Sequence, residues 1–438
     1  TFEYILFVEY AVRIVGCSSR GGACMREFQV EVDADGRLVL PAEVAERLGL
    51  MPGATVHVEL NGQTLLARQT IHRLSKVYIE PTTACNLACR TCVRNVWDEP
   101  MGRMSGDTFA RIAAGIEALS LPLKVFFGGF GEPLFHPEII EMVWQAKARG
   151  AFVELITNGT LLDENRSRQL IAAGLDRLWV SLDGATPESY TDVRLGAALP
   201  TVIANVERFR SLRPTAVMPT PEIGIVFVAM ERNYHDLPDV LRLARRLGAT
   251  RFMVSNVLPH TPEMRREVLY AHAMSNDTFF PSPRQPELVM PKMDAARLAD
   301  PALYEAICGD WNLNFTGTHT QLTSDRCPFI EAGATAIGWD GGVSPCLPLL
   351  HSNHNYLNGL DRYARRYIVG NINERDLLDL WQAPEYVAFR ARVQAFDFAP
   401  CTICDGCTLS ETNEEDCYGN GFPTCGGCLW AQGFVQCP

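Results

Sequence analysis

The chain has 438 residues, of which 47% are hydrophobic and 21% charged, and this length allows two or three globular domains. Its formal net charge of −12 argues against a large nucleic-acid-binding surface. No apolar run reaches the length of a membrane span, so we expect neither a nucleic-acid-binding nor a membrane protein.

Residues 1–24 contain a short apolar stretch that Glu9 and Arg13 interrupt. The stretch lacks a basic leader and a small-residue cleavage site, so we do not interpret it as a signal peptide. Because Met25 stands just before the first well-patterned segment, we interpret residues 1–24 as an upstream extension or a misplaced start.

Residues 25–70 predict a small β-rich module. Its expected elements are strands at 28–32, 38–40, 55–60 and 63–68 and a short helix at 42–48. The segment DADGRLVLPAEVAERLGLMPGATVHVEL resembles the swapped-hairpin domain of AbrB-type transcription regulators, which dimerises and binds DNA. Since acidic residues outnumber basic ones in this module, we favour a homodimer or a docking role over DNA binding.

Residues 75–260 alternate between strand and helix patterns. Strands are expected at 77–80, 123–127, 152–156, 177–181, 223–229 and 252–255, with helices between them, the first of which has Ser105 as its N-cap. This alternation favours an α/β fold with a parallel sheet, closed into a partial (β/α)6 barrel of the TIM type. In such barrels the chemistry lies at the carboxyl ends of the strands.

Residues 261–326 are irregular in pattern, and we interpret them as a connecting or substrate-side segment. Residues 327–438 are rich in cysteine, with nine of the chain's 15 cysteines. A disulfide framework is a weak explanation, because a chain of this length can build a large core without such links. Metal clusters explain the cysteines better, and they imply a reducing, cytoplasmic environment.

Three cysteines stand close together in the segment CNLACRTC, directly after the first strand of this series. Cys85, Cys89 and Cys92 are soft thiolate ligands of the kind that bind iron–sulfur clusters. A [4Fe–4S] cluster bound only by thiolates takes four cysteines, so three leave one iron open to another ligand. The alternative is a structural zinc site with its fourth ligand elsewhere.

The C-x3-C-x2-C spacing resembles the signature of the radical S-adenosylmethionine (SAM) superfamily. The resemblance implies that the open iron chelates the amino and carboxylate groups of SAM. An electron from the cluster then cleaves the sulfonium C–S bond, and the 5′-deoxyadenosyl radical takes a hydrogen atom from a substrate. It also implies a low-potential electron donor such as ferredoxin or flavodoxin.

A glycine-rich segment follows the second strand and strengthens this resemblance. Gly128, Gly129, Gly131 and Glu132 belong to FGGFGEP, which is similar to the Gly-Gly-Glu-Pro segment that holds the amino group of SAM in the family. Glycine lets backbone amides and carbonyls approach a ligand closely. An aromatic residue, Phe130, is inserted within the motif.

Two further segments stand at strand ends. Asn158 lies in an Ile-Thr-Asn-Gly turn after the third strand, and its side chain can both donate and accept hydrogen bonds. Ser181 and Asp183 end the fourth strand, and Arg194 follows. The resemblance assigns these positions to binding the ribose and carboxylate region of SAM, for which arginine is well suited. Without the preceding motif, Arg194 would be interpreted as a surface ion pair.

The cysteine-rich tail resembles the SPASM domain, which carries auxiliary [4Fe–4S] clusters in many radical enzymes. Nine cysteines are expected to supply one or two such clusters: Cys327, Cys346, Cys401, Cys404, Cys407, Cys417, Cys425, Cys428 and Cys437. The spacing departs from the central run of the family, so the individual ligands stay open. Two Cys-x2-Cys pairs, at Cys404 and at Cys425, also fit a zinc ribbon. We expect His351 and His354 to be solvent-facing loop residues.

One resemblance covers nearly the whole chain, namely that to the radical maturases of tungsten-cofactor oxidoreductases of the aldehyde ferredoxin oxidoreductase kind. The stretches that carry it include KVYIEPTTACNLACRTCVRNVW, FFGGFGEPLFHP, LWVSLDGATPESYTDVRLGAALP and NEEDCYGNGFPTCGGCLWAQGFVQCP. It implies a role in maturing a tungsten-dependent oxidoreductase or its cofactor precursor. The alternatives are a radical enzyme that modifies a peptide or protein and a non-catalytic metal-binding regulatory protein. No catalytic acid or base can be named.

Overall fold

The computed structural model describes two compact units, Thr1–Arg73 and Leu74–Pro438. In the first unit it describes six short strands. In the second it describes residues 74–119, 123–216, 219–270, 287–291, 293, 300–303, 312–315, 326–357, 360–402 and 407–438.

The first unit contains three antiparallel strand pairs. They are β1 (Ala11–Arg13) with β2 (Glu27–Gln29), β3 (Glu31–Val32) with β4 (Leu38–Val39), and β5 (Val58–Asn61) with β6 (Thr64–Ala67). The strands predicted for the β-rich module are therefore confirmed, and β1 lies in the stretch interpreted as an extension. The predicted helix at 42–48 lies outside the described residues, and the likeness to AbrB-type domains stays a prediction.

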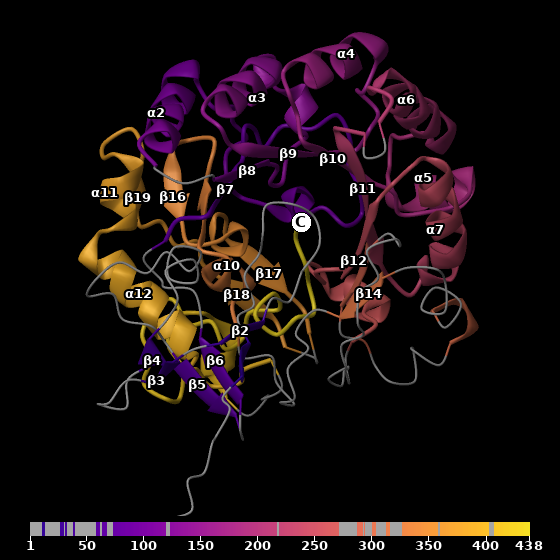
Figure 1. Ribbon diagram of the computed structural model, residues 1–438. Helices are drawn as coiled ribbons and strands as arrows, with labels where there is room; N and C mark the ends of the chain where they lie inside the picture. The colour runs from indigo at the N-terminus through magenta and orange to yellow at the C-terminus, as the bar shows by residue number, and fades with distance from the viewer. Residues whose placement is uncertain are drawn as a thin grey trace, which may run out of the picture. The chain divides into compact units, whose positions relative to one another are not determined.

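A parallel sheet forms the centre of the second unit (Figure 1). Six neighbouring strands in chain order match the predicted ones and confirm the α/β class with a partial barrel. They are β7 (Lys76–Ile79), β8 (Lys124–Phe127), β9 (Phe152–Thr157), β10 (Arg177–Ser181), β11 (Glu222–Ala229) and β12 (Arg251–Asn256). Most of their residues are buried, because side chains cover both faces.

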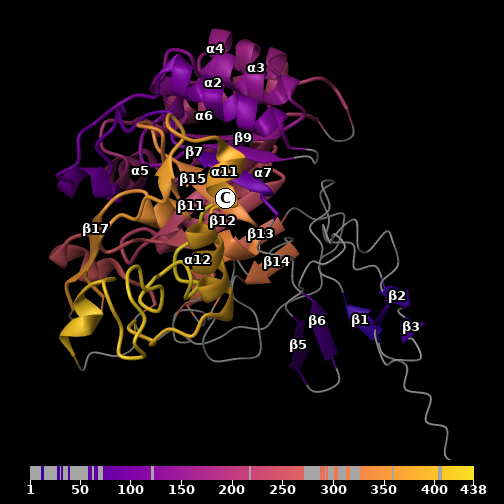
Figure 2. The ribbon, with the colours of Figure 1, turned by 90° about the vertical axis from the view of Figure 1, so that its left-hand side faces the viewer.

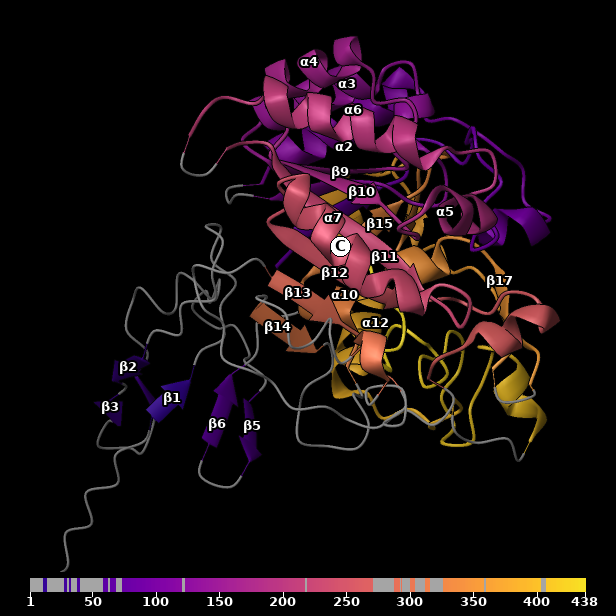
Figure 3. The same cartoon turned by 90° about the vertical axis from the view of Figure 1, so that its right-hand side faces the viewer.

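Helices cover the outer face of this sheet (Figures 1 and 3). They are α2 (Gly106–Glu117), α3 (Ile139–Ala148), α4 (Glu164–Ala172), α5 (Pro187–Val193), α6 (Leu199–Leu212) and α7 (Leu237–Arg246). Ser105 caps α2 as predicted, since its hydroxyl accepts a hydrogen bond from the Thr108 amide at 3.1 Å. No helix in the described residues is both long and apolar enough to cross a membrane.

Five further strands extend the sheet at its two sides. β13 (Glu287–Met290) and β14 (Asn312–Phe315) continue the parallel order beyond β12, and β15 (Ala334–Ile337) pairs parallel with β7. The last two of them, β16 (Gly342–Ser344) and β19 (Gly370–Asn371), pair antiparallel beyond β15. The interpretation of residues 261–326 as irregular is therefore wrong at β13 and β14. Each strand has only four residues, too few for periodicity to distinguish a strand from a loop.

The cysteine-rich tail folds around short elements next to the open side of the sheet (Figure 2). These are α10 (Pro328–Glu331), β16 (Gly342–Ser344), β17 (Asn353–Asn355), β18 (Arg362–Ala364), β19 (Gly370–Asn371), α11 (Leu377–Trp381) and α12 (Pro384–Ala395). The last residues lie inside the curve of the strands (Figure 1), where the Lys76 ammonium and the Tyr78 hydroxyl donate to the Pro438 carbonyl at 2.7 and 3.0 Å.

Candidate active site

The three clustered cysteines lie on the loop that follows β7. Each of their sulfur atoms has a nitrogen donor beside it. Arg94 Nε lies 3.1 Å from the Cys92 sulfur, Asn158 Nδ2 lies 3.8 Å from that of Cys85, and Arg194 Nη1 lies 3.9 Å from that of Cys89. Donors placed in this way stabilise thiolates and the sulfur ligands of an iron–sulfur cluster.

Arg94 also fixes the shape of the cysteine loop. Its two Nη atoms donate to the carbonyls of Thr83 at 3.0 Å and Leu87 at 3.1 Å, on opposite sides of Cys85. One side chain therefore ties three points of the loop together. The sequence analysis did not identify Arg94, although a basic residue two positions after the last cysteine was a usable signal.

The thiols of Cys85 and Cys89 are partly withdrawn from water, and burial raises the pKa of each. They are therefore neutral until a metal displaces their protons. Among the described residues, no three His, Cys, Asp or Glu side chains are gathered closely enough to hold a single metal ion. The assignment of the three thiols to one cluster rests on their shared loop and on their donors.

The glycine-rich loop packs directly on the cysteine loop. A Cβ atom at Gly131 would lie 2.0 Å from the Thr82 carbonyl oxygen, and the Glu132 amide donates to the Ala84 carbonyl at 2.9 Å. Gly129 has a φ of +139° and lies against the Glu80 side chain, and Gly128 lies against Phe126. Only glycine allows this approach of two backbones, which places FGGFGEP beside Cys85.

The Glu132 carboxylate joins the loops after β8 and β9. It is buried, and it accepts hydrogen bonds from the Thr157 hydroxyl and the Asn158 amide, both at 2.7 Å, and from the Leu134 amide at 3.0 Å. Burial raises its pKa despite these donors. These contacts show that Glu132 holds the two loops together. Its predicted contact with SAM stays a prediction.

Asn158 stands where the sequence analysis placed it, at the end of β9. Its Nδ2 donates to the Asn86 side chain at 3.0 Å, and its Oδ1 accepts from the Thr160 amide and hydroxyl at 2.9 and 2.6 Å. Asn86 lies next to Cys85, so this amide network joins the turn after β9 to the cysteine loop.

The end of β10 carries a buried ion pair. Asp183 is fully buried and accepts from the Arg194 Nε at 2.5 Å and from the Val228 amide at 2.7 Å. Although burial alone would lower the pKa of Arg194, the Asp183 carboxylate raises it, so the guanidinium stays charged beside Cys89. The alternative of a surface ion pair is wrong. Ser181 is buried at the end of the same strand.

The segment around Arg194 packs against the cysteine loop. The Ala88 amide donates to the Leu195 carbonyl at 3.3 Å, the Arg90 amide donates to the Val193 carbonyl at 3.0 Å, and Arg90 forms an ion pair with Asp192 at 3.1 Å. The stretch DVRLG therefore holds the cysteine loop in place.

Tyr190 lies one helical turn before Arg194 and was missed by the sequence analysis. It is fully buried, and its hydroxyl has no hydrogen-bond partner among the residues that the structure describes. Burial raises its pKa well above the usual range, against the opposing effect of the Arg194 guanidinium. Leaving such a group unsatisfied costs about 1–3 kcal/mol, so a ligand that bonds to it gains affinity.

The structure corrects the expectation for His351. This side chain is buried: its Nε2 lies 2.7 Å from Glu80 Oε2, and its Nδ1 lies 2.5 Å from Glu99 Oε2. Burial alone would lower its pKa, but the two carboxylates raise it to about 9. His354 is half-exposed beside Asp361, as expected.

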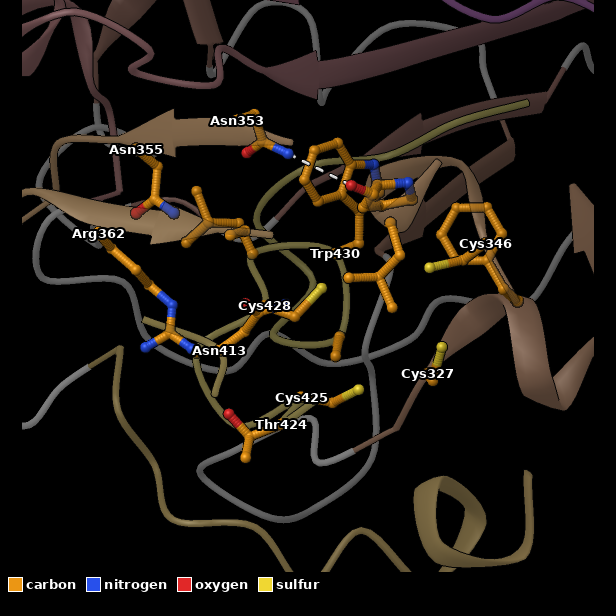
Figure 4. A pocket seen from close by; sticks show the side chains of 17 residues that line it. Cys327, Cys346, Asn353, Asn355, Arg362, Asn413, Thr424, Cys425, Cys428 and Trp430 are labelled. Atoms are coloured by element: carbon orange, nitrogen blue, oxygen red, sulfur yellow. Dashed lines mark hydrogen bonds between the residues drawn. The ribbon is translucent and has the colours of Figure 1, made fainter. Parts of the chain in front are cut away.

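Four cysteines of the tail line one cavity, and Figure 4 shows their side chains. The volume of the cavity is about 50 Å³. They are Cys327, Cys346, Cys425 and Cys428. Burial raises the pKa of each thiol, that of Cys327 to about 12. The wall is otherwise mostly apolar, and four thiols in one cavity are the number that a [4Fe–4S] cluster requires.

The other described cysteines of the tail are not among the residues that line that cavity. Cys401 is buried, Cys407 and Cys417 are exposed, and Cys404 lies outside the described residues. Cys437 accepts a hydrogen bond from the Trp430 indole at 3.3 Å. Because Cys425 and Cys428 share a cavity with Cys327 and Cys346, the structure does not favour pairing them with Cys404 and Cys407 in a zinc ribbon.

Comparison with known proteins agrees with this geometry. The radical SAM superfamily pattern matches residues 79–244, and that of the SPASM iron–sulfur cluster-binding domain matches residues 327–408. The tungsten-containing aldehyde ferredoxin oxidoreductase cofactor-modifying protein of Pyrococcus furiosus is 32% identical over 367 residues, covering 83% of this chain and 96% of that protein. This chain belongs to the radical SAM superfamily.

Two other similar proteins match less. The AdoMet-dependent heme synthase of Methanosarcina barkeri is 31% identical over 182 residues, which cover 41% of this chain and 50% of that protein. The crystal structure of Streptococcus suis SuiB bound to S-adenosylmethionine has a TM-score of 0.52 at 16% identity, covering 79% of this chain and 73% of that one. This second likeness shows a shared fold.

Family membership confirms the predictions of an enzyme and of its cofactors. The radical SAM domain implies a [4Fe–4S] cluster and SAM, and the SPASM domain implies auxiliary iron–sulfur clusters. The described residues fit these groups, since the cysteine loop offers three thiols with nitrogen donors and the tail offers four buried thiols around one cavity.

Proposed function

We propose that this radical SAM enzyme acts in the maturation of a tungsten-cofactor oxidoreductase of the aldehyde ferredoxin oxidoreductase kind, or of its cofactor. The observation that carries this proposal is the extent of the likeness to the Pyrococcus furiosus cofactor-modifying protein, which covers 83% of this chain and 96% of that one. The match to the heme synthase covers 41% of this chain. The tungsten-related likeness therefore spans more than a shared radical SAM core.

Cys85, Cys89 and Cys92 are proposed to hold the SAM-binding [4Fe–4S] cluster. The nitrogen donors at 3.1–3.9 Å from their sulfur atoms support this assignment. When bound, the cluster supplies the electron that cleaves the sulfonium C–S bond of SAM, giving the 5′-deoxyadenosyl radical that abstracts hydrogen from the substrate.

The residues around the cysteine loop are proposed to position SAM. Gly128, Gly129 and Gly131 let the loop after β8 pack closely beside the cysteine loop, and Asn158 Nδ2 lies 3.8 Å from the Cys85 sulfur. Arg194, oriented by Asp183, presents a cation to the carboxylate end of SAM. Ser181 lies on the same strand end.

Tyr190 adds a hydroxyl that is free to bind the cosubstrate. It is buried beside Arg194 and has no partner within the described residues. A hydroxyl in this place can donate one hydrogen bond and accept others. We place it among the SAM-binding groups for that reason.

The tail is proposed to hold two auxiliary clusters. Cys327, Cys346, Cys425 and Cys428 form the first set, supported by their common cavity (Figure 4). The second set is assigned by exclusion to the four cysteines between the two halves of the first set, which are Cys401, Cys404, Cys407 and Cys417. Cys437 is then left outside both sets.

The remaining partners follow from the chemistry. A low-potential donor such as ferredoxin or flavodoxin is proposed to reduce the clusters, and thiol-bound clusters suit a reducing cytoplasm. The unit Thr1–Arg73 is proposed to form a homodimer contact, because its hairpins resemble a domain that dimerises.

The test is a cell in which a tungsten-dependent oxidoreductase is produced with and without this chain. We expect the oxidoreductase to be inactive without the chain, and its extracted cofactor to differ in mass. An active enzyme with an unchanged cofactor mass would contradict the proposal. If 5′-deoxyadenosine forms with a peptide but not with cofactor precursors, the enzyme is instead a peptide-modifying one.

A further inference from the structure

A histidine of the tail lies between two carboxylates of the catalytic half. His351 follows the 3-10 turn Leu347–Leu349, five residues after Cys346. Glu80 lies at the carboxyl end of β7, and Glu99 lies beyond the cysteine loop. The partners are 271 and 252 residues apart along the chain, so this contact exists only when the tail has folded onto the barrel.

The contact requires a charged imidazole ring. Each ring nitrogen faces a carboxylate oxygen, at 2.7 Å to Glu80 and 2.5 Å to Glu99, and carboxylates only accept hydrogen bonds when ionised. Both nitrogens therefore donate, which they do together only in the imidazolium form. Glu99 has a further donor in the Ser352 amide at 2.8 Å.

Glu80 depends on His351 more than Glu99 does. The Glu80 side chain is fully buried, whereas that of Glu99 is 16% exposed and also lies 3.8 Å from Arg366. A buried carboxylate without a counter-charge strongly destabilises the folded protein. Among the described residues, His351 is the only cationic group that forms an ion pair with Glu80.

The second oxygen of Glu80 holds the glycine-rich loop. Glu80 Oε1 accepts a hydrogen bond from the Phe130 amide at 2.9 Å, inside the segment FGGFGEP. Gly129 is pressed against the same side chain, where a Cβ atom would approach Glu80 Oε1 to 2.7 Å. The orientation of Glu80 therefore sets the backbone path of this loop.

Two aromatic rings close the cluster. Trp97 stacks on the His351 ring with centroids 4.3 Å apart, and Phe130 meets the same ring edge-on at 5.6 Å. These rings shield the three charged groups from water, which strengthens the electrostatic interaction between them. Phe130, the aromatic residue inserted in the glycine motif, thus has a defined contact with the tail.

We propose that His351 is a positioning residue that makes the SAM-binding shape of the Gly128–Pro133 loop depend on the folded auxiliary region. The chain of contacts runs from the tail through His351 to Glu80, and from Glu80 to the Phe130 amide. The inference rests on the proposed role of that loop in binding SAM. It makes the SPASM region part of the SAM site and not only a carrier of clusters.

The test measures the affinity of the reduced, cluster-loaded full chain for SAM. The readout is the change that SAM causes in the electron paramagnetic resonance signal of the SAM-binding cluster. In His351→Phe, we expect a dissociation constant roughly tenfold higher, within the usual range for coupling between sites. The rate of 5′-deoxyadenosine formation at saturating SAM should fall much less, which a general loss of structure would not produce.

His354→Phe is the matched control, because His354 lies three residues further on, is half-exposed and has no contact with Glu80 in the structure. Its affinity should equal that of the unchanged chain. If His351→Phe fails to fold, Glu99→Gln is the second variant, because it removes one of the two carboxylates that contact the ring. It should still raise the dissociation constant for SAM roughly several-fold, which is a weak coupling between sites.

Wild-type affinity for SAM in a fully loaded His351→Phe protein, or in Glu99→Gln where the first variant is unfolded, would overturn the inference. That outcome leaves the radical SAM assignment intact, because the unchanged chain still binds and cleaves SAM. An unchanged chain that shows no SAM-dependent signal would instead contradict the proposed site.

Discussion

Arg194 Nε donates to Asp183 Oδ2 at 2.5 Å, and the same guanidinium lies 3.9 Å from the Cys89 sulfur. Asp183 is fully buried, and only 12% of the Arg194 side chain is exposed. The pair thus brings a positive charge to the cysteine loop without exposing it to water, and its geometry depends on both partners.

Asp183→Asn should abolish most 5′-deoxyadenosine formation. The substitution leaves a buried guanidinium without its counter-charge, a change that typically costs about 3–5 kcal/mol of folding free energy. Anaerobic urea unfolding and product assay by chromatography measure the two effects. Arg168→Gln is the control, since it removes an exposed pair with Glu164 that contributes about 0–1 kcal/mol. Equal behaviour of the two variants would refute the role assigned to Asp183.

Gly131→Ala should separate the glycine-rich loop from the cysteine loop. The new methyl group would lie 2.0 Å from the Thr82 carbonyl oxygen, which neither backbone can avoid without moving. We expect normal iron content in the tail with SAM binding weakened at least tenfold. Gly106→Ala, whose nearest contact is 3.8 Å away, should behave like the unchanged protein. An alanine at 131 that leaves SAM affinity unchanged would show that this close approach is unimportant.

Cys85→Ala should abolish SAM cleavage and leave the auxiliary clusters in place. If all three sites hold [4Fe–4S] clusters, iron should fall from about 12 to about 8 per chain, because each cluster contains four irons. Cys346→Ala should lose a similar amount of iron, and the electron paramagnetic resonance signal that responds to SAM should remain. Anaerobic metal analysis that finds about four irons and zinc in the unchanged chain would remove the auxiliary clusters from the proposal.

The barrel was predictable because its strands and helices alternate with clear periodicity from Lys76 onward. The short strands β13 and β14 were not, since their positions depend on pairing with β12 and not on a local pattern. In the site, the order of motifs located the cysteine and glycine loops. His351 was missed because both of its partners lie more than 250 residues away, and no local signal marks a contact of that range.

Tyr190 illustrates a different limit. In the sequence it is one apolar position on a helix after a capping residue, Thr186, and that pattern predicts only a core side chain. Its unsatisfied hydroxyl becomes visible once the neighbours are placed. The role of Arg94 likewise becomes visible only in the structure, where its three acceptors all lie within the loop that it stabilises.

Arg362→Gln should lower the midpoint potential of one auxiliary cluster. Arg362 is buried beside Gly427, donates to the Ser410 carbonyl at 2.6 Å, and has the sulfur atoms of Cys401, Cys425 and Cys428 as neighbours. Removing a cation next to a cluster makes the more negative, reduced form less stable. A redox titration, monitored by electron paramagnetic resonance, measures the shift in midpoint potential.

Arg365→Gln is the control for this variant, because Arg365 forms a half-exposed pair with Glu414 at 2.9 Å. It should leave all potentials unchanged, and the SAM-binding cluster should keep its potential in both variants. Unchanged auxiliary potentials in a fully loaded Arg362→Gln protein would be incompatible with a guanidinium beside these thiols.

The charge on His351 should make the stability of the protein depend on pH. The pKa of His351 is raised from 6.5 to about 9 by Glu80 and Glu99, against the effect of burial. A raised pKa of this kind contributes stability that is fully present below pH 6.5 and is lost as the pH rises through 9. The shift corresponds to about 3 kcal/mol.

The measurement compares the unfolding free energies of the unchanged chain and His351→Gln between pH 6.5 and 9.5 under anaerobic conditions. The difference should be largest at about pH 6.5 and should shrink toward the alkaline end, because only the unchanged chain then loses its imidazolium. Thiols that titrate in this range are common to both proteins and cancel in the difference. His354→Gln, at a half-exposed ring beside Asp361, is the matched control for replacing a histidine. A constant difference for His351→Gln would mean that the ring between the two carboxylates is neutral, and the two hydrogen bonds could not then both be donated by His351.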